Sequence, residues 1–131
     1  VNDDTIEHFK CDIIAGAANN VLDDEDLHGN MLLDKGIMYA PDYVINAGGL
    51  INVASELEGY VRERAHQKAS RIYDTMLDIL TYSEDNQIPT YVASNRLAEE
   101  RIRKVQRLNS IYSSSSHFSG RKGEVYLQDR N

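Results

Sequence analysis

Two short polar loops carry the residue types that could bind a ligand. Asn19 and Asn20 are adjacent carboxamides, and Asn46 stands shortly before the pair Gly48 and Gly49. Each carboxamide offers two donors and an acceptor, enough to hold a ligand's amide, hydroxyl or amino group. The glycines would leave the first turn of a helix open to a negatively charged or polarised group. A structural interpretation stays open beside this one: the asparagines cap turns and the glycines permit close packing.

The segments around the first loop predict a parallel α/β unit. The apolar run at residues 11–15 predicts a buried strand, and residues 37–40 predict a second strand. Residues 29–35 predict a short helix closed by a left-handed Gly36, whereas the acidic residues 23–28 are expected to be a solvated loop. Because ligands of parallel sheets bind at the carboxyl ends of the strands, both polar loops are expected at one edge.

A glycine-rich helix start is expected after the second strand. The chain continues as an apolar strand segment through residues 44–45 to Asn46, which has the side chain of a good N-cap. From Leu50 the apolar spacing is helical until Gly59 offers a stop. Leu50 and Val53 are three residues apart and share one face, which indicates either ordinary core or the wall of an apolar pocket.

Two long amphipathic helices are predicted in the rest of the chain. The first continues beyond Gly59 and ends near residues 84–87, and the second has Thr90 as its N-cap. Two pairs of opposite charge lie four residues apart on the second helix, Glu99 with Arg103 and Glu100 with Lys104. From residue 113 the sequence has little to bury, which predicts a flexible tail.

Composition excludes several functional classes. The chain has 131 residues and a net charge of −7, which opposes binding to nucleic acid. No apolar run is long enough to span a membrane. The single Cys11 lies in an apolar run, which favours a core side chain over a nucleophile and a reducing, cytoplasmic location. The four histidines lack metal-ligand spacing, so no metal is expected.

The familiar motifs of nucleotide and hydrolase sites do not occur in the sequence. There is no Gly-x-Gly-x-x-Gly, no phosphate-binding loop and no Gly-x-Ser-x-Gly elbow. No lysine lies in an apolar stretch that would lower its pKa. The residues therefore describe half of a ligand site without its proton-transfer groups. The chain also begins without methionine, which we interpret as the continuation of an upstream segment.

A resemblance to a known family lies in residues 15–20, 39–56, 88–93 and 96–102, and it extends in order over residues 1–108. These stretches resemble the C-terminal part of leucine dehydrogenases, within the Glu/Leu/Phe/Val amino-acid dehydrogenase family. The run Pro-Asp-Tyr-Val-Ile-Asn-Ala-Gly-Gly is typical of the group. The triplet that contains Asn52 is similar to leucine enzymes, whereas phenylalanine and valine relatives more often carry glutamine there.

The resemblance implies a fold and an activity. It implies the C-terminal part of a Rossmann-like NAD-binding domain with short parallel strands over residues 1–58. Long helices over 59–112 would pack on it and lead back towards an absent N-terminal domain, with the tail over 113–131. The implied reaction is the NAD-dependent, reversible oxidative deamination of L-leucine and other branched-chain L-amino acids to 2-oxo acids and ammonia. The implied assembly is a homo-oligomer.

The resemblance also assigns residues. The cofactor contacts would be Ala18, Asn19, Asn20, Asn46, Gly48 and Gly49. The substrate pocket would be lined by Asn20, Leu50 and Val53. Relatives usually carry valine in place of Leu50, so the leucine is expected to narrow the pocket. The catalytic residues would lie in the N-terminal domain, and the fragment alone is expected to be inactive.

Two alternatives stay open. The chain could be a non-catalytic binding or assembly module derived from the family, or part of a phenylalanine- or valine-specific relative. An intact enzyme would show turnover that a module lacks, and the amino acid preferred would separate the relatives.

Overall fold

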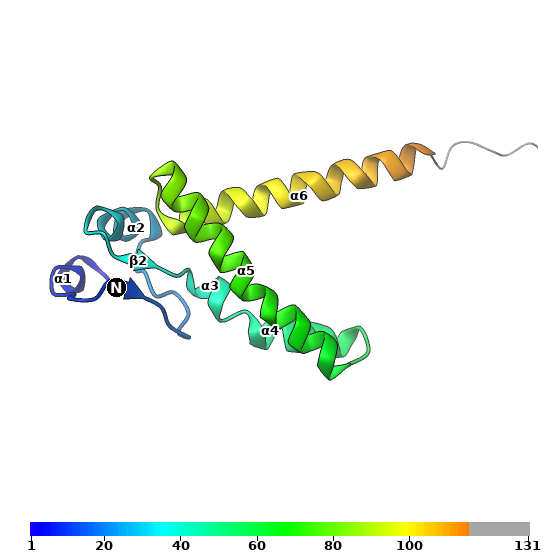
Figure 1. The fold of residues 1–131 in the computed structure, drawn as a ribbon, viewed down its shortest axis with the longest axis horizontal. Helices are drawn as coiled ribbons and strands as arrows, with labels where there is room; N and C mark the ends of the chain where they lie inside the picture. The colour runs from blue at the N-terminus through cyan, green and yellow to red at the C-terminus, as the bar shows by residue number, and fades with distance from the viewer. Residues whose placement is uncertain (116–131) are drawn as a thin grey trace, which may run out of the picture. The chain divides into compact units, whose positions relative to one another are not determined.

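The fold is given by a computed structural model that describes the backbone of residues 1–115 and the side chains of residues 1–108. Its elements are α1 (Asp3–Ile6), β1 (Ile13–Ile14), α2 (Glu25–Asp34), β2 (Met38–Tyr39), α3 (Asp42–Ile45), α4 (Gly48–Leu57), α5 (Arg62–Asn86) and α6 (Thr90–Ser115) (Figure 1). Val1–Ala98 form one compact unit, and the chain from Glu99 onward belongs to a second. The predicted flexible tail is wrong for residues 113–115, which belong to α6, and its remainder, residues 116–131, lies outside the described residues.

The two strands form a parallel pair, as predicted. Ile13 is paired with Met38 and Ile14 with Tyr39, and α2 connects the strands. The Ala40 amide donates to the Ile14 carbonyl at 2.9 Å. Each strand is only two residues long, so the expected strands at 11–15 and 37–40 are confirmed in position and direction but not in length.

Helix α2 begins earlier than the sequence predicts, and the expected loop at residues 23–28 is wrong. Asp24 caps the helix by accepting the Leu27 amide at 2.8 Å, and acidic residues fill the first turn. Such residues stabilise a helix N-terminus, so the acidic segment is helix rather than loop. His28 is 3% exposed and packs inside the structure. At the other end, Gly36 has the predicted left-handed conformation, with a φ of 69°.

The core lies between α1, α2 and the strands. Its buried members are Ile6, Leu22, Leu32, Ile37 and Tyr39. Partly buried side chains on the same cluster include Ile14, which lies beside Tyr39 in the sheet register. One face of the small sheet is therefore covered.

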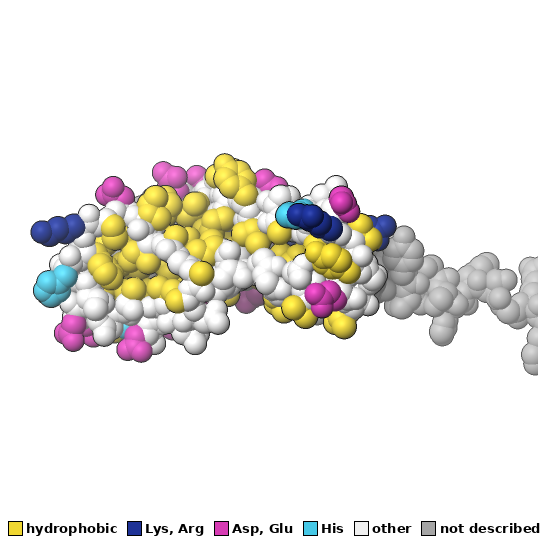
Figure 2. Space-filling model, turned by 90° about the horizontal axis from the view of Figure 1, so that it is seen from below, with side chains coloured by type: hydrophobic (Ala, Val, Ile, Leu, Met, Phe, Trp, Pro, Cys, Tyr) yellow, Lys and Arg dark blue, Asp and Glu magenta, His cyan; other side chains and the backbone are white. Residues whose placement is uncertain are grey.

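The opposite face of the sheet is apolar and uncovered among the described residues. Ile13 and Met38 are register partners, and they are 58% and 43% exposed. Figure 2 shows hydrophobic side chains gathered on one face of the molecule. Cys11, expected in the core, is exposed instead. Parallel sheets are normally covered on both faces, and no described element covers the segment that carries Cys11.

The segment after β2 is helical rather than extended. The Pro41 carbonyl accepts the amides of Val44 and Ile45 at 3.0 and 3.2 Å, which closes the short helix α3 where an apolar strand segment was expected. Apolar residues of this kind occur in either structure, and the run is too short for its spacing to separate helix from strand.

The long helices follow the prediction closely. Helix α4 packs against α5, which begins after Gly59 turns the chain with a φ of 85° (Figure 1). Helix α5 ends at Asn86, inside the expected range, and Thr90 is the first residue of α6 rather than its cap. The Glu99–Arg103 and Glu100–Lys104 pairs both form. None of the helices within residues 1–115 combines the length and hydrophobicity that a membrane span requires.

Candidate functional site

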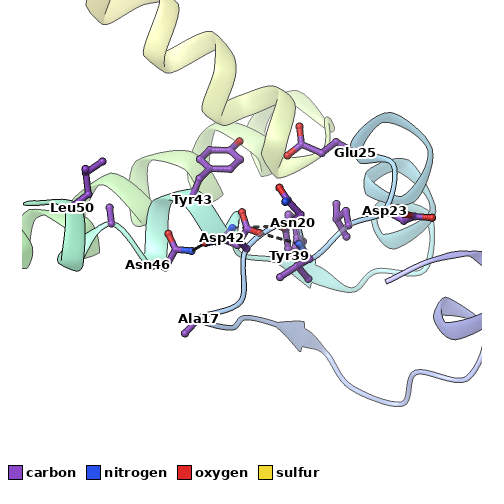
Figure 3. A pocket seen from close by; sticks show the side chains of 13 residues that line it. Ala17, Asn20, Asp23, Glu25, Tyr39, Asp42, Tyr43, Asn46 and Leu50 are labelled. Carbon is purple, nitrogen blue, oxygen red and sulfur yellow. Dashed lines mark hydrogen bonds between the residues drawn. The ribbon is translucent and has the colours of Figure 1, made fainter.

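The two polar loops meet at one edge of the sheet. The Asn46 side-chain amide donates to the Asn19 side-chain oxygen at 2.7 Å, which joins the loop after β1 to the end of α3 (Figure 3). The sequence prediction that the loops lie together is confirmed. This bond also shows that Asn19 does not merely cap its own turn.

Asn46 does not cap α4, so the predicted N-cap is wrong. It is the C-cap of α3, and its backbone amide donates to the Asp42 carbonyl at 2.9 Å. The N-cap position of α4 belongs to Ala47, which makes no side-chain capping bond. The unexpected helix α3 shifts Asn46 to a helix end, and its side chain is thereby available to Asn19.

An open cleft of about 840 Å³ lies beside this contact (Figure 3). Four of the residues predicted to bind cofactor or substrate line it, namely Asn19, Asn20, Asn46 and Leu50. The other four do not line it, namely Ala18, Gly48, Gly49 and Val53. Its volume lies within the range of small-molecule sites.

Sequence reasoning missed the polar residues at the bottom of the cleft. Asp42 is 5% exposed, and its Oδ2 accepts the Val21 amide at 2.9 Å. The Asp42 amide donates to the Tyr39 hydroxyl at 3.3 Å. The one signal in the sequence was a carboxylate inside an otherwise apolar run, because a buried charge needs such hydrogen bonds.

Two tyrosines contribute neutral phenols to the cleft. Burial raises the pKa of Tyr39 above its ordinary value, and the hydrogen bond from Asp42 opposes this rise. Burial also raises the pKa of Tyr43, opposed by a hydrogen bond with the Ser94 side chain. Both hydroxyls therefore remain protonated at neutral pH.

The lining of the cleft is acidic. Asp23, Glu25 and Asp42 contribute carboxylates, while the described lining contains no lysine, arginine or histidine. Carboxylates, carboxamides and phenols favour a cationic or uncharged polar ligand group over an anionic one. This part of the site is therefore unsuited to a phosphate.

The glycines and the apolar face of α4 are open. A Cβ at Gly48 or Gly49 would meet no heavy atom within 4 Å, so close packing inside the described structure does not account for them. Leu50 and Val53 are 74% and 55% exposed. The interpretation of these two residues as ordinary core is wrong for the described structure.

The described structure is mostly helical around a small parallel sheet with a crossover helix, and its cleft lies at the carboxyl ends of the strands, which is consistent with a fragment of an α/β protein. No protein-family model matches the chain. The chain is 54% identical over 112 residues to a leucine dehydrogenase of Thermoactinomyces intermedius, and the match covers 86% of this chain and 30% of the relative. A phenylalanine dehydrogenase of Bacillus thermotolerans is 50% identical over 115 residues, or 88% of this chain and 30% of the relative.

A solved structure shows the same relationship. The L-tryptophan dehydrogenase of Nostoc punctiforme is 51% identical with a TM-score of 0.79, over 81% of this chain and 32% of that one. The chain spans about a third of the length of the relatives that it matches. Over most of its length it is thus about 50% identical to members of the amino-acid dehydrogenase family, and it matches a C-terminal fragment of them.

Proposed function

We propose that the chain is the C-terminal part of an NAD-dependent amino-acid dehydrogenase that oxidatively deaminates L-leucine and other branched-chain L-amino acids. The observation that carries the proposal is the Asn19–Asn46 contact beside the cleft, in a chain about half identical to leucine dehydrogenases. The contact brings together two loops that would otherwise be separate turns.

The chemistry of the cleft suits the nicotinamide end of NAD better than the pyrophosphate. NAD, when bound, would accept the hydride from the α-carbon of the amino acid. The nicotinamide ring of its oxidised form is cationic and its ribose is uncharged, so both suit a lining of carboxylates and carboxamides. A pyrophosphate does not suit that lining and would be bound by residues outside this chain.

The residues of the chain would bind and orient rather than transfer protons. Asn19 and Asn20 would hydrogen-bond the nicotinamide ribose, and Asn20 would also reach the amino end of the substrate. Ala18 would contact the cofactor from the same loop. Holding two reactants in a fixed geometry is a large part of catalysis, and the proton-transfer groups would come from the absent N-terminal domain.

The start of α4 would form a second wall of the binding site for cofactor and substrate. The open backbone at Gly48 and Gly49 would let the cofactor approach closely beside Asn46. Leu50 and Val53 would line the side-chain pocket of the substrate, because both are apolar and exposed on one helical face. Their exposure would end when the N-terminal domain and substrate cover them.

The proposal includes the organisation of the intact protein. Residues 1–58 would complete a Rossmann-like NAD-binding domain, and the helices over 59–112 would lead back to the N-terminal domain. The intact enzyme would be a cytoplasmic homo-oligomer that acts on amino acids and 2-oxo acids.

The test measures NADH formation at alkaline pH by the intact protein and by the 131-residue chain, side by side. The substrates are L-leucine, L-valine, L-phenylalanine, L-tryptophan and L-glutamate. We expect turnover of leucine or valine by the intact protein and none by the chain alone. If the intact protein forms no NADH with any of the five amino acids, the assignment as an amino-acid dehydrogenase is wrong. That result would support the alternative of a non-catalytic module.

An aromatic amino acid is the second candidate substrate. The relatives at about 50% identity include a phenylalanine and a tryptophan dehydrogenase, nearly as similar as the leucine enzymes. If the intact protein prefers phenylalanine or tryptophan, the reaction class stands and the branched-chain assignment fails.

A further inference from the structure

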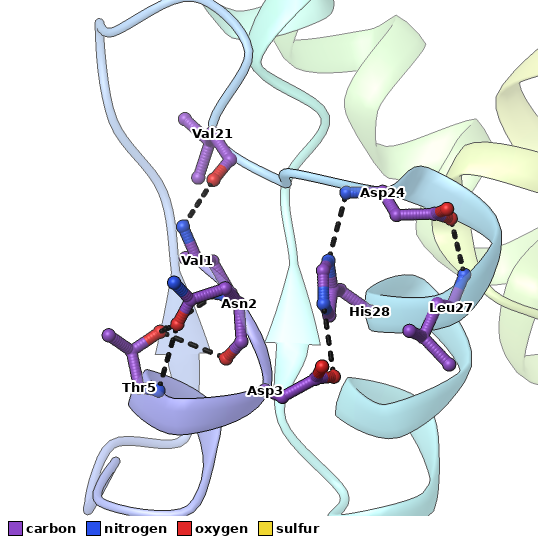
Figure 4. A network of polar contacts seen from close by, with 8 residues as sticks. All are labelled: Val1, Asn2, Asp3, Thr5, Val21, Asp24, Leu27 and His28. Atoms are coloured by element: carbon purple, nitrogen blue, oxygen red, sulfur yellow. Dashed lines mark hydrogen bonds and ion pairs between the residues drawn. The ribbon is translucent and has the colours of Figure 1, made fainter.

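The segment that follows the two asparagines is held from both sides. The Val21 amide donates to the Asp42 carboxylate at 2.9 Å, and the Val21 carbonyl accepts the Val1 nitrogen at 2.7 Å (Figures 3 and 4). The Asp23 amide donates to the Val1 carbonyl at 3.0 Å. Both polar backbone groups of Val21 are thus satisfied by residues distant in sequence, which fixes the loop directly after Asn20.

The Asp42 carboxylate forms its hydrogen bond with the loop after β1 rather than with an amide of its own helix α3. Asp42 is the first residue of α3, where an acidic side chain commonly stabilises the helix N-terminus. Here its Oδ2 reaches the Val21 amide across the chain. The residue is buried, and no lysine, arginine or histidine forms an ion pair with it in the described part of the chain. A buried carboxylate depends on such hydrogen bonds.

Asp42 and Asn46 act from the same side of α3. They stand four residues apart, which places them one helical turn from each other. Asn46 binds Asn19, and Asp42 binds Val21, so the two contacts bracket Asn20. Asn20 adopts a left-handed φ of 54°, which is uncommon for non-glycine residues but which asparagine adopts more readily than most.

We propose that Asp42 is a positioning residue for the cofactor site: by accepting the Val21 amide it holds Asn19 and Asn20 against the cleft. This inference rests on the proposed function, because it assigns Asn19 and Asn20 a ligand. The proposal assigns Asp42 the role of an acceptor for the Val21 amide and assigns no role to its negative charge.

The test uses the intact protein with Asp42→Ala, which removes the acceptor, and Asp42→Asn, which keeps an oxygen acceptor without the charge. The matched control is Asp24→Ala, which removes the same kind of bond at the start of α2, where the backbone amide of Leu27 donates to the Asp24 carboxylate. For each protein we would measure the Kd for NADH by fluorescence, the KM for NAD and for the amino acid, kcat, and hydrogen exchange of the Val21 amide.

We expect Asp42→Ala to raise the NADH Kd and the KM for NAD about 10-fold, the effect of losing one hydrogen bond to a charged group. Exchange of the Val21 amide should accelerate, while the KM for the amino acid changes less. Asp42→Asn should restore the NADH Kd to within about 3-fold. Asp24→Ala should lower thermal stability and leave the KM for NAD unchanged.

Three results would overturn the inference. The first is faster exchange of the Val21 amide in Asp42→Ala with an unchanged NADH Kd. The second is a rise of the NADH Kd in Asp24→Ala as large as that in Asp42→Ala. The third is a rise of the NADH Kd by 10-fold or more in Asp42→Asn, which would show that the negative charge matters instead. If Asp42→Ala fails to fold, the result for Asp42→Asn still decides the inference. If the wild-type protein neither binds NADH nor turns over an amino acid, the proposed function itself fails, a result distinct from these three.

Discussion

Asn46 and Asn19 are 27 residues apart in sequence, yet their side chains are joined by a hydrogen bond of 2.7 Å. The bond is possible because β1 and β2 are parallel, so the chain leaves both strands at the same edge of the sheet. Helix α3 then turns the Asn46 side chain towards the first loop (Figure 3). Either asparagine alone would be an ordinary turn residue, and the pair forms one wall of a cleft.

A double-mutant cycle in the intact protein tests whether this pair serves the ligand. Asn19→Ala and Asn46→Ala should each raise the NADH Kd, and the double variant should cost less than the sum, with a coupling of about 0.5 to 1.5 kcal/mol. Asn52→Ala is the control, because Asn52 bonds only weakly to Glu56 at 3.4 Å on the exposed side of α4. Coupling seen in the free energy of unfolding but not in NADH binding would favour the turn-capping interpretation.

The size of Leu50 should set the substrate preference. Leu50→Val adds space to the proposed pocket, and one methylene is worth roughly 1 to 3 kcal/mol in such a pocket. We expect the ratio of kcat/KM for phenylalanine to that for leucine to rise about 10-fold. Leu57→Ala is the control, because Leu57 is on the same helix, is 88% exposed and does not line the cleft. An unchanged ratio in Leu50→Val would remove Leu50 from the pocket.

Glycines at two helix positions should respond oppositely to alanine. A Cβ at Gly29 would lie 2.7 Å from two ring carbons of the buried Tyr91, so Gly29→Ala should lower the free energy of unfolding by about 1 to 2 kcal/mol despite the better helix propensity of alanine. Gly48→Ala meets open space and should be neutral or stabilising by up to about 1 kcal/mol.

Urea unfolding of both variants measures these free energies. Gly48→Ala adds a second readout: a weaker NADH affinity without any loss of stability would indicate that the cofactor approaches the backbone there. If Gly48→Ala binds NADH like the wild type, the open space at this glycine has no role in binding.

The parts of the fold that follow from local patterns could be predicted from the sequence. Helical spacing and the glycine at position 59 located α4 and α5, and Gly36 was recognised as the end of α2. The parallel pairing of the strands followed from their order around a helix. Each of these signals is local, so no tertiary contact was needed to read it.

The wrong or missing predictions concern residues whose burial or hydrogen bonds depend on tertiary contacts. Asn46 has the side chain of an N-cap, and only the short helix α3 turns it into a partner of Asn19. Cys11 lies in an apolar run, but burial depends on a covering element that the described chain does not provide. The hydrogen bond of Asp42 could not be predicted because its partner, the Val21 amide, lies 21 residues away and has no sequence signature.

The bond between Tyr91 and Asp26 should make stability sensitive to alkaline pH. The Tyr91 hydroxyl donates to an Asp26 oxygen at 2.7 Å and joins the start of α6 to α2. Burial, together with the bond to Asp26 and its charge, raises the pKa of Tyr91 from 10.0 to about 12. The folded state therefore keeps a proton that the unfolded state has lost, so the stabilisation is complete below about pH 10 and disappears as the pH rises through about 12.

Tyr91→Phe separates this titration from the rest of the protein. At pH 8 it should lower the free energy of unfolding by about 1 kcal/mol, the value of one hydrogen bond, because Asp26 is exposed and can bind water instead. Between pH 10 and 12 the wild type should lose stability faster than the variant. Asp26→Asn removes the charge and should shift the titration of Tyr91 to lower pH, which tyrosinate absorbance near 295 nm would report. Parallel stability curves for wild type and Tyr91→Phe from pH 8 to 12 would show that Tyr91 titrates without a link to folding.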